Sequence, residues 1–534
     1  MFNRSTISIF LLGSVCLLVS CRPSTGEDKP RAGQDSGAEE TGQADTQHSG
    51  GDSGADTAPV VVDGVELVRV EREDHEDYGY ELATYAVVGD GYLSTDGELP
   101  SFQVFRPIET PSAELPLLVW FHGGHIGNDA SGQLPENCQR EAIDANIQMV
   151  TGEASLVTEM AARRGWAMLI PRNDWCDAGF GLGDEDPVEP GRHFGQYHVE
   201  RALAWVDAGH AGFQPGGARF GWGTSAGGAW SFYTAHRLGG FSALVVDSGS
   251  CDQVLLHGQD PGSVEHILGG APYDSNGDPS AVFSRYQETS CTTLVDEGGL
   301  RVPAYVAWND QDMVIPANQP ARLVSSMENA SNNGGLRYGA HDFDHGAPSP
   351  NHHVQTRLRN LPWGYTTDAM FAFLEGRRVV WREAEAGCLP EPCDVGQVGS
   401  TESRWASFSH GAGVKVGPND GAGVVFRTAV PPGFAAQQPV SVVAVVDVDG
   451  LDGLAGRTET LTLSYTEGER REEVHIPAEV FAPDTNATDA ELLQQYETTR
   501  FTFTPQAPAG GVVSVRARGV GEIYLDALLF IGEQ

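Results

Sequence analysis

The sequence has very little lysine and little positive charge of any kind. Only Lys29 and Lys415 are lysines, and 33 Lys+Arg stand against 73 Asp+Glu, for a formal net charge of −40. Nucleic-acid binding needs basic patches, and electrostatic adhesion to an anionic membrane needs clustered basic side chains. The composition therefore excludes a nucleic-acid partner and membrane binding by charge. An uncharged substrate suits so acidic a surface better than a polyanion does.

Long apolar runs and zinc-binding spacings are also missing. The apolar run over residues 7–19 is too short for a membrane-spanning helix, which needs about 20 residues. No Cys-x-x-Cys and no His-Glu-x-x-His spacing occurs, so we expect no metal centre of those types.

The N-terminal segment has the pattern of an export signal. Arg4, the short apolar run and a small residue before Cys21 are typical of a signal peptide. Leu18-Val19-Ser20-Cys21 resembles the lipobox of bacterial lipoproteins, which implies cleavage before Cys21 and acylation of that cysteine, palmitate included. We therefore expect a signal peptide over 1–20 and an exported protein that its lipid anchors to a bacterial membrane, at the outer membrane or cell surface. Residues 21–60 read as a disordered acidic linker behind the lipidated cysteine.

Cysteine usage agrees with export. One of the eight cysteines leaves with the signal and one is the lipidation site, so six remain. An even number in an exported chain favours disulfides, although the connectivity does not follow from sequence. Nearest-neighbour pairing is our hypothesis: Cys138 with Cys176, Cys251 with Cys291, and Cys388 with Cys393.

Apolar runs alternate with stretches of helical pattern in the central part of the sequence. Continuous apolar runs are typical of strands buried on both faces of a sheet. Earlier segments separated by Gly and Asp predict antiparallel strands. We predict an α/β fold over residues 61–380, with a doubly wound, mostly parallel sheet whose ligands bind at the carboxyl ends of the strands. The apolar runs are 117–121, 167–170, 219–222, 243–246 and 304–307; the helical stretches are 155–164, 199–208, 226–238, 317–329 and 367–376; the earlier strands include 67–70, 82–88 and 102–105.

Ser225 is the candidate nucleophile. It stands in Gly223-Thr224-Ser225-Ala226-Gly227, a Gly-x-Ser-x-Gly pattern between an expected strand and an expected helix. At such a turn the serine has a strained backbone, so small neighbours are needed, and its hydroxyl leaves the sheet at a helix N-terminus. Backbone N–H groups and the helix dipole there stabilise a developing oxyanion.

A second glycine-rich segment, His122-Gly123-Gly124-His125, follows the 117–121 run. Glycines at the end of a buried strand let backbone N–H groups approach a ligand closely. Together with the serine pattern, this segment resembles the α/β-hydrolase superfamily, and its His-Gly-Gly esterases most closely. The resemblance implies an oxyanion hole built from the N–H groups of Ala226 and Gly124, with His125 as the alternative to Gly124. It also implies a structural role for His122.

The family order of serine, acid and histidine along the chain points to an aspartate after the 304–307 run. Asp312 precedes Pro316 by four residues, a spacing that relatives often show, so we choose Asp312 over Asp310. Its role would be to orient the catalytic imidazole and stabilise the imidazolium.

The histidine is expected in the loop after a strand predicted over 336–340. His345 is followed by Gly346, as the base commonly is in relatives, and is the candidate base. His341 is the alternative. Attack by Ser225 with His345 as general base requires no cofactor.

One further segment has two readings. Trp175 follows the 167–170 run and stands beside Cys176, which makes it a candidate substrate-binding residue. A surface loop pinned by a disulfide is the alternative.

Residues 381–534 read as a second domain. Apolar and polar residues alternate there in at least six segments, which is the period of half-exposed strands, and an all-β, jelly-roll-like sandwich is expected. The ends of this region resemble galactose-binding-like jelly rolls, which often bind carbohydrate and a structural calcium ion. On that resemblance Glu383, Glu385 and Asp526 are candidate calcium ligands, with ordinary charged strand ends as the alternative.

These observations predict a lipid-anchored serine hydrolase that cleaves carboxylic esters, with acylated polysaccharide as the substrate considered. A serine peptidase of the prolyl-oligopeptidase type shares the residue order, but the chain before residue 117 is too short for its propeller. A catalytically idle surface-binding lipoprotein is the alternative from another class. The sequence leaves the oligomeric state open.

Overall fold

The described part of the chain begins at residue 60. The predicted signal peptide (1–20) and Cys21 lie outside it, as does the rest of the predicted linker up to residue 59. Among the described residues, no helix is long and apolar enough to cross a membrane. The computed structural model describes residues 60–62, 65–75, 80–88, 101–108, 114–123, 156–171, 194–297, 299–309, 312, 315–343, 361–383, 395–396, 413–415, 425–448, 460–477, 480, 498–508, 510–518 and 523–532.

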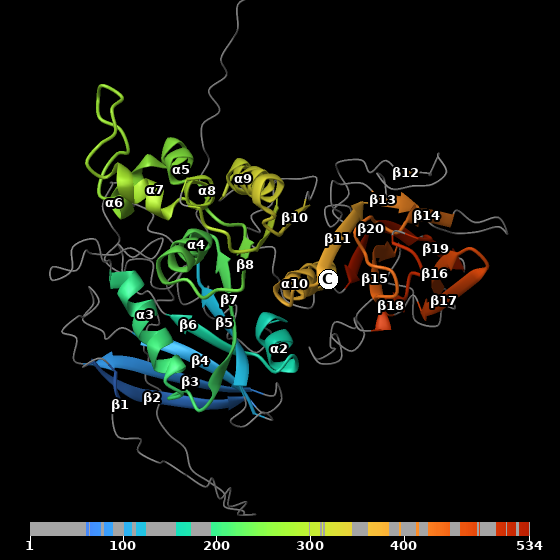
Figure 1. Cartoon of the computed structure of the whole chain (residues 1–534), viewed down its shortest axis with the longest axis horizontal. Coiled ribbons are helices and arrows are strands. Elements are labelled where there is room, and N and C mark those ends of the chain that lie inside the picture. Colours follow the sequence, from blue (N-terminus) through green and yellow to red (C-terminus); the bar gives the residue numbers. More distant parts are fainter. Residues whose placement is uncertain are drawn as a thin grey trace, which may run out of the picture. The chain divides into compact units, whose positions relative to one another are not determined.

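Ten strands form one mixed sheet in the order β1-β2-β3-β4-β6-β5-β7-β8-β9-β10 (Figure 1). The first four strands are antiparallel neighbours, as their turn-rich sequence predicts, and β4 is antiparallel to β6. All neighbouring strands from β6 to β10 are parallel. The α/β class is confirmed. The strands are β1 (Val60–Val62), β2 (Val65–His75), β3 (Tyr80–Val88), β4 (Ser101–Pro107), β5 (Glu114–Phe121), β6 (Ala167–Pro171), β7 (Gln214–Thr224), β8 (Ala243–Asp247), β9 (Ala304–Asn309) and β10 (Tyr338–Phe343).

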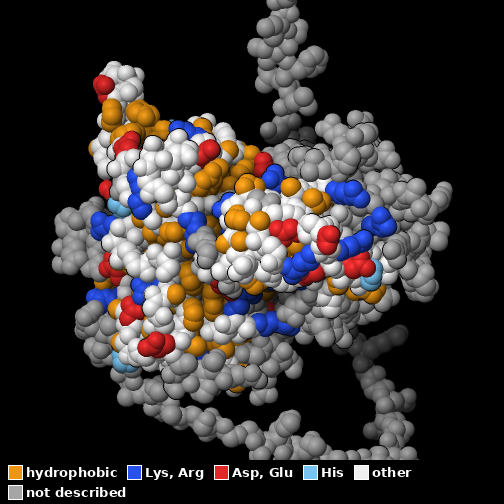
Figure 2. Space-filling view, turned by 45° about the vertical axis from the view of Figure 1, so that its right-hand side comes forward, with side chains coloured by type: hydrophobic (Ala, Val, Ile, Leu, Met, Phe, Trp, Pro, Cys, Tyr) orange, Lys and Arg blue, Asp and Glu red, His pale blue; other side chains and the backbone are white. Residues whose placement is uncertain are grey.

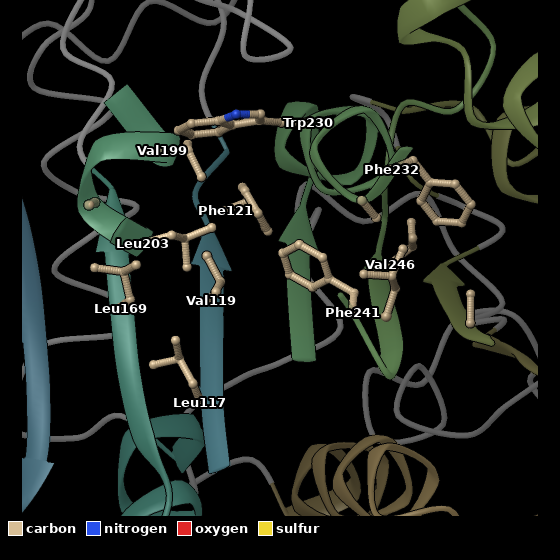
Figure 3. Close-up of a cluster of buried hydrophobic side chains, with 14 of the residues drawn as sticks. Leu117, Val119, Phe121, Leu169, Val199, Leu203, Trp230, Phe232, Phe241 and Val246 are labelled. Atoms are coloured by element: carbon tan, nitrogen blue, oxygen red, sulfur yellow. The ribbon is translucent and has the colours of Figure 1, made fainter. Parts of the chain in front are cut away.

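Helices cover both faces of the parallel strands, as continuous apolar runs require. On one face α3, α4, α8 and α9 pack on inward residues such as Val119 and Val246. Figure 3 shows part of this cluster, where Val199 and Leu203 of α3 and Trp230 of α4 lie over the strands. On the other face α2 and α10 pack on the alternate residues of the same strands. The helices are α2 (Leu156–Arg163), α3 (Phe194–Asp207), α4 (Ala226–Leu238), α5 (Gln253–Gln259), α6 (Pro261–Leu268), α7 (Phe283–Thr289), α8 (Cys291–Asp296), α9 (Asn318–Gly334) and α10 (Leu361–Leu374).

Four short helices, α5 to α8, connect β8 with β9, and the sequence pattern did not predict them. Val264, Leu268 and Tyr286 of this insertion pack against Ala229 and Tyr233 of α4. Helices of six to eight residues are unstable alone. Their stability therefore comes from this contact with the helix that follows Ser225.

The C-terminal region forms two antiparallel sheets. One has the order β12-β13-β20-β15-β18, with β11 also paired to β20, and the other has the order β14-β19-β16-β17. Phe426, Leu463 and Val515 of the second sheet share one core with Val442 and Phe530 of the first. This two-layer packing agrees with the predicted β-sandwich. The strands are β11 (Arg378–Glu383), β12 (Val395–Gly396), β13 (Gly413–Lys415), β14 (Val425–Ala429), β15 (Val440–Val448), β16 (Thr460–Glu467), β17 (Arg470–Pro477), β18 (Arg500–Phe503), β19 (Val512–Arg518) and β20 (Ile523–Gly532).

The core on the α2 and α10 face of the ten-stranded sheet extends into the C-terminal sheets. Val443 of β15 and Leu529 and Ile531 of β20 are fully buried and belong to the same cluster as Met370 and Phe371 of α10. Each fully buried Val, Leu or Ile contributes about 1.5–3 kcal/mol. Helix α10 is therefore buried from both sides, and β11, which follows it directly, spans the predicted boundary at residue 380.

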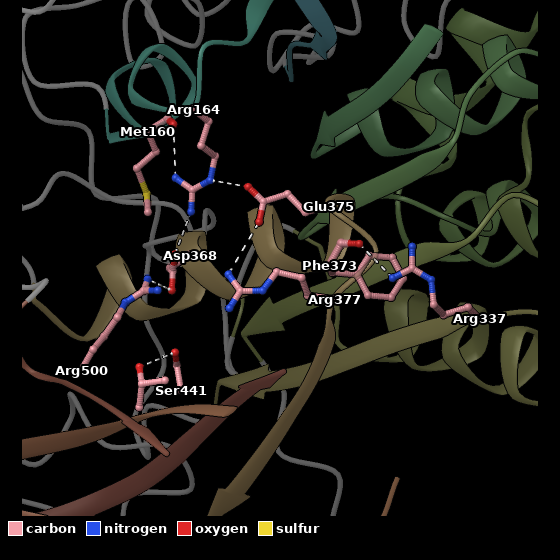
Figure 4. A network of polar contacts seen from close by, with 10 residues as sticks. Met160, Arg164, Arg337, Asp368, Phe373, Glu375, Arg377, Ser441 and Arg500 are labelled. Carbon is pink, nitrogen blue, oxygen red and sulfur yellow. Dashed lines mark hydrogen bonds and ion pairs between the residues drawn. The ribbon is translucent and has the colours of Figure 1, made fainter. Parts of the chain in front are cut away.

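Polar contacts reinforce this junction (Figure 4). The Asp368 carboxylate on α10 has no exposed surface and pairs with two guanidinium groups: Arg164, at 2.9 Å, and Arg500 of β18. Arg164 also donates a 2.9 Å hydrogen bond to Glu375. A buried carboxylate held by two arginines ties the C-terminal sheets to α10.

Charged side chains of both signs are interspersed over the face presented in Figure 2. Some acidic side chains of the C-terminal sheets pair with arginine, for example Glu473 with Arg471 on β17, at 2.8 Å. The described residues on this face form no large patch of acidic side chains alone.

Candidate active site

Ser225 lies at the sharp turn between β7 and α4, where the sequence predicts a nucleophile. Its backbone has φ 56° and ψ −123°, a conformation that residues other than glycine rarely adopt. The Ser225 N–H donates to the Asp247 carbonyl at 3.0 Å, and the Ser225 carbonyl accepts from the N–H groups of Gly228 and Ser250. Neighbouring backbone thus holds the strained turn in place. The side chain is 8% exposed and stands at the N-terminus of a 13-residue helix, whose dipole favours negative charge.

The glycines of the Gly-x-Ser-x-Gly pattern are required by close backbone approach. A Cβ atom at Gly223 would overlap the Gly227 carbonyl, and one at Gly227 would overlap the Phe121 carbonyl. The N-terminal turn of α4 therefore packs directly on β7 and on the end of β5. This contact fixes the position of Ala226, the first residue of α4, against the end of β5.

The predicted oxyanion segment begins at this same contact. His122 is buried, and its Nδ1 atom lies 2.7 Å from the Gly123 carbonyl oxygen, an acceptor, so Nδ1 is the protonated nitrogen. The imidazole ring packs edge-on against Trp230 of α4, with ring centroids 5.4 Å apart. These contacts agree with a structural role for His122. Gly124 and His125, the candidate oxyanion donors of this loop, lie outside the described residues.

Asp312 follows β9 and is almost fully buried. Its Oδ1 atom accepts a 3.0 Å hydrogen bond from the Ile315 N–H, and its own N–H donates to the Asn309 carbonyl at 3.1 Å. Strands β7, β8 and β9 are parallel neighbours, so Ser225 and Asp312 come from the same edge of the sheet. The alternative, Asp310, lies outside the described residues.

The strand before the predicted base is longer than expected. It runs from Tyr338 to Phe343, so His341 lies within β10 and not in a loop. The His341 ring is buried and stacks on Trp381, with centroids 4.0 Å apart and an interplanar angle of 19°. Phe343 pairs with Asn309 of β9, so the chain leaves β10 beside the strand end that leads to Asp312. His345 lies outside the described residues and stays a prediction.

Cys251 and Cys291 are buried free thiols, so the prediction of a disulfide between them is wrong. An even number of cysteines does not show whether any two of them are paired. A buried free thiol packs as a small apolar side chain. The Cys291 Sγ atom lies 3.8 Å from the Gly228 carbonyl, and burial raises the pKa of this thiol. Burial likewise raises the pKa of Tyr233 on α4 to about 12, so neither group ionises at neutral pH.

The remaining predicted residues divide between the described and undescribed parts. Glu383 pairs with Ala527 across β11 and β20, one position from Asp526, so two candidate calcium ligands lie on adjacent strands. Among the described residues, no group of three His, Cys, Asp or Glu side chains is arranged to hold a metal ion. The predicted residues outside the described part also include Trp175, Glu385 and the cysteines Cys138, Cys176, Cys388 and Cys393.

Sequence reasoning missed the loop that braces the nucleophile. Ser248 directly follows β8 with φ 48°, and its N–H donates to the Ala307 carbonyl at 2.8 Å. Two residues further along, the Ser250 backbone N–H donates to the Ser225 carbonyl at 3.1 Å. The only available signal was the small Ser-Gly-Ser sequence after a buried strand.

Comparisons with known proteins give limited likenesses. No protein-family model matches the sequence, and no curated protein matches it. Solved structures that it resembles include an S-formylglutathione hydrolase from Agrobacterium tumefaciens (14% identity, 52% of this chain and 90% of that chain, TM-score 0.37). A second is a truncated carbohydrate esterase from gut microbiota (14% identity, 55% of this chain and 96% of that chain, TM-score 0.36). A third is esterase B from Lactobacillus rhamnosis (13% identity, 60% of this chain and 89% of that chain, TM-score 0.36). At such TM-scores a functional assignment rests on the residues of the site.

Proposed function

We propose that this chain is a serine hydrolase that cleaves carboxylic esters through an acyl-enzyme. The observation that carries the proposal is the strained backbone of Ser225 at a strand–helix turn, held by backbone hydrogen bonds. Strain of this kind persists only where the surrounding structure fixes it, and it concentrates at functional sites.

The proposed reaction uses the residues at the carboxyl edge of the sheet. The Ser225 hydroxyl attacks the ester carbonyl while His345 accepts its proton, and the N–H groups of Ala226 and Gly124 hold the oxyanion. His345 then protonates the leaving alcohol. Water, activated by the same imidazole, attacks the acyl-enzyme, and collapse of the second tetrahedral intermediate releases the acid and restores Ser225. Asp312 keeps the imidazole in the required tautomer.

Acylated polysaccharide is the substrate class that we propose. An ester-linked acyl group on a neutral sugar avoids repulsion from a protein with a net charge of −40. The C-terminal sandwich offers a second surface on which a polymeric substrate can rest, although the fold alone assigns no lectin function. Short acyl groups such as acetyl, and aromatic ones such as feruloyl, are the chemistries to compare.

We also propose that the protein is exported and lipid-anchored through Cys21. The lipobox-like sequence supports this proposal, and the acidic body would remain in solution beyond the linker. Metabolic labelling with palmitate checks it, since the label should be lost in Cys21→Ser.

Hydrolysis of p-nitrophenyl esters and acylated polysaccharides by the purified protein tests the proposed function. We expect Ser225→Ala to lose activity by several orders of magnitude while it retains the fold. Ser325→Ala is the matched control, because the Ser325 hydroxyl lies on the exposed side of α9 and donates to the Ala321 carbonyl of the same helix. Full activity in Ser225→Ala contradicts the proposal. Activity on peptides together with no activity on esters would instead support a peptidase.

A further inference from the structure

Trp381 of β11 bridges two strands of the catalytic sheet. Its indole ring stacks on the His341 ring of β10, with centroids 4.0 Å apart. Its Nε1–H group donates a 2.8 Å hydrogen bond to the Tyr305 hydroxyl of β9. One side chain from the C-terminal sheets thus contacts both strands that lead to the predicted acid and base.

The two strands need such support because β10 is the last strand of its sheet among the described residues. An edge strand has a hydrogen-bonded neighbour on one side only. The Tyr305 ring packs closely over Gly339 of β10, because a Cβ atom at that glycine would lie 2.5 Å from the ring. Tyr305 also packs on Phe373 of α10, with centroids 5.5 Å apart. The aromatic contacts therefore pin β10 against β9 on the face covered by α10.

Trp381 is itself held rigidly. It pairs with Leu529 on β20, and Leu529 is fully buried in the core shared with α10. The pairing of Asp368 on α10 with Arg500 of β18 closes the same junction from another side (Figure 4). Movement of Trp381 would therefore require separation of the C-terminal sheets from α10.

We propose that Trp381 is a positioning residue of the hydrolase. It fixes His341 and Tyr305, so that the segments following β10 and β9 present His345 and Asp312 to Ser225. The C-terminal sheets are on this view part of the catalytic unit. This inference rests on the proposed function. Misplacement of a catalytic group by about 1 Å costs on the order of 10²-fold in rate, which sets the expected effect.

Steady-state kinetics of two variants on a p-nitrophenyl ester test the inference. Trp381→Leu removes the stacking and the hydrogen bond, and we expect kcat to fall by roughly 10²-fold with KM within about twofold. The acid limb of the kcat/KM profile should move to lower pH, because an imidazolium displaced from its carboxylate is less stable. Arg471→Ala is the control, since it removes only an exposed ion pair with Glu473 on β17 of the C-terminal sheets; it should keep both kcat and the pH profile.

Two milder variants keep the test informative if Trp381→Leu does not fold. Trp381→Phe and Tyr305→Phe each delete one partner of the same hydrogen bond, so their effects on kcat should be non-additive in the double variant. Wild-type kcat in Trp381→Leu overturns the inference, as does equal loss of kcat in Arg471→Ala, or additive effects of the two Phe variants. A wild-type protein that neither hydrolyses esters nor reacts with a fluorophosphonate at Ser225 would instead overturn the proposed function, which separates the two failures.

Discussion

Gly227 packs so closely on the carbonyl oxygen of Phe121 that no side chain fits between them. This contact joins the first turn of α4, which follows Ser225, to the end of β5, which leads into the predicted oxyanion loop. The two halves of the proposed catalytic apparatus are thus positioned by one backbone contact. The spacing Gly-x-Ser-x-Gly acquires its physical meaning here.

Gly227→Ala should separate these two segments. The added methyl would overlap the carbonyl oxygens of Phe121 and His122, so the end of β5 must shift. We expect hydrolysis to fall by about 10²–10³-fold, as for loss of one oxyanion donor. Gly258→Ala is the control, because nothing lies within 4 Å of a Cβ atom there and α5 gains about 0.5–1 kcal/mol. Ester hydrolysis and chemical denaturation of both variants check this; an active Gly227→Ala would contradict it.

Ser225→Gly should be inactive and more stable than Ser225→Ala. A φ of 56° strains any residue with a Cβ atom by about 1–3 kcal/mol, and glycine avoids this strain at an entropic cost of about 0.5–1 kcal/mol. We therefore expect the glycine variant to have a free energy of unfolding higher by about 0.5–2 kcal/mol. Urea denaturation of the two inactive variants measures the difference. Equal stability would mean that the strain is no larger than the entropic cost of glycine.

Asp312→Asn should lower kcat by about 10³–10⁴-fold with little loss of stability. The asparagine oxygen can still accept the hydrogen bond from the Ile315 N–H, so the loop keeps its shape. The matched variant is Asp310→Asn, which should keep most of the activity. The reverse result would assign the acid role to Asp310.

Asp368→Ala should destabilise the protein strongly. The carboxylate is fully buried and pairs with both Arg164 and Arg500, so its removal takes one ion pair from each guanidinium group, at a cost of about 3 kcal/mol. Glu473→Ala removes an exposed pair, whose side chains are 59% and 41% accessible, and should cost at most about 1 kcal/mol. Thermal unfolding of both variants checks the contrast. Equal effects would mean that the junction adds little to stability.

The sequence predicted the parallel strands well because they are buried on both faces. Strands β5 to β9 contain the predicted apolar runs, and α4 has the predicted bounds, since strand, Gly-x-Ser-x-Gly and helix form one local pattern. Local pattern failed where distant contacts decide the structure. The end of β10, His341-Asp342-Phe343, is polar and read as loop; it is a strand whose His341 ring packs on Trp381, 40 residues further along the chain.

Other misses have the same cause. The short helices α5 to α8 are stabilised by packing on α4, and β17 (Arg470–Pro477) is a largely polar strand that its pairing with β16 defines. The thiols of Cys251 and Cys291 are buried in the core, which a count of cysteines does not reveal. Of the predicted triad, Ser225 and Asp312 come from the expected strand ends, and His345 stays a prediction.

The most direct test of the central claim is mass-spectrometric mapping of a fluorophosphonate probe on the native protein. We predict one modified peptide, with the probe on Ser225, and no modification in Ser225→Ala. Modification of another serine, labelling that persists in Ser225→Ala, or a folded protein that does not react at all would contradict the proposal that Ser225 is an activated nucleophile.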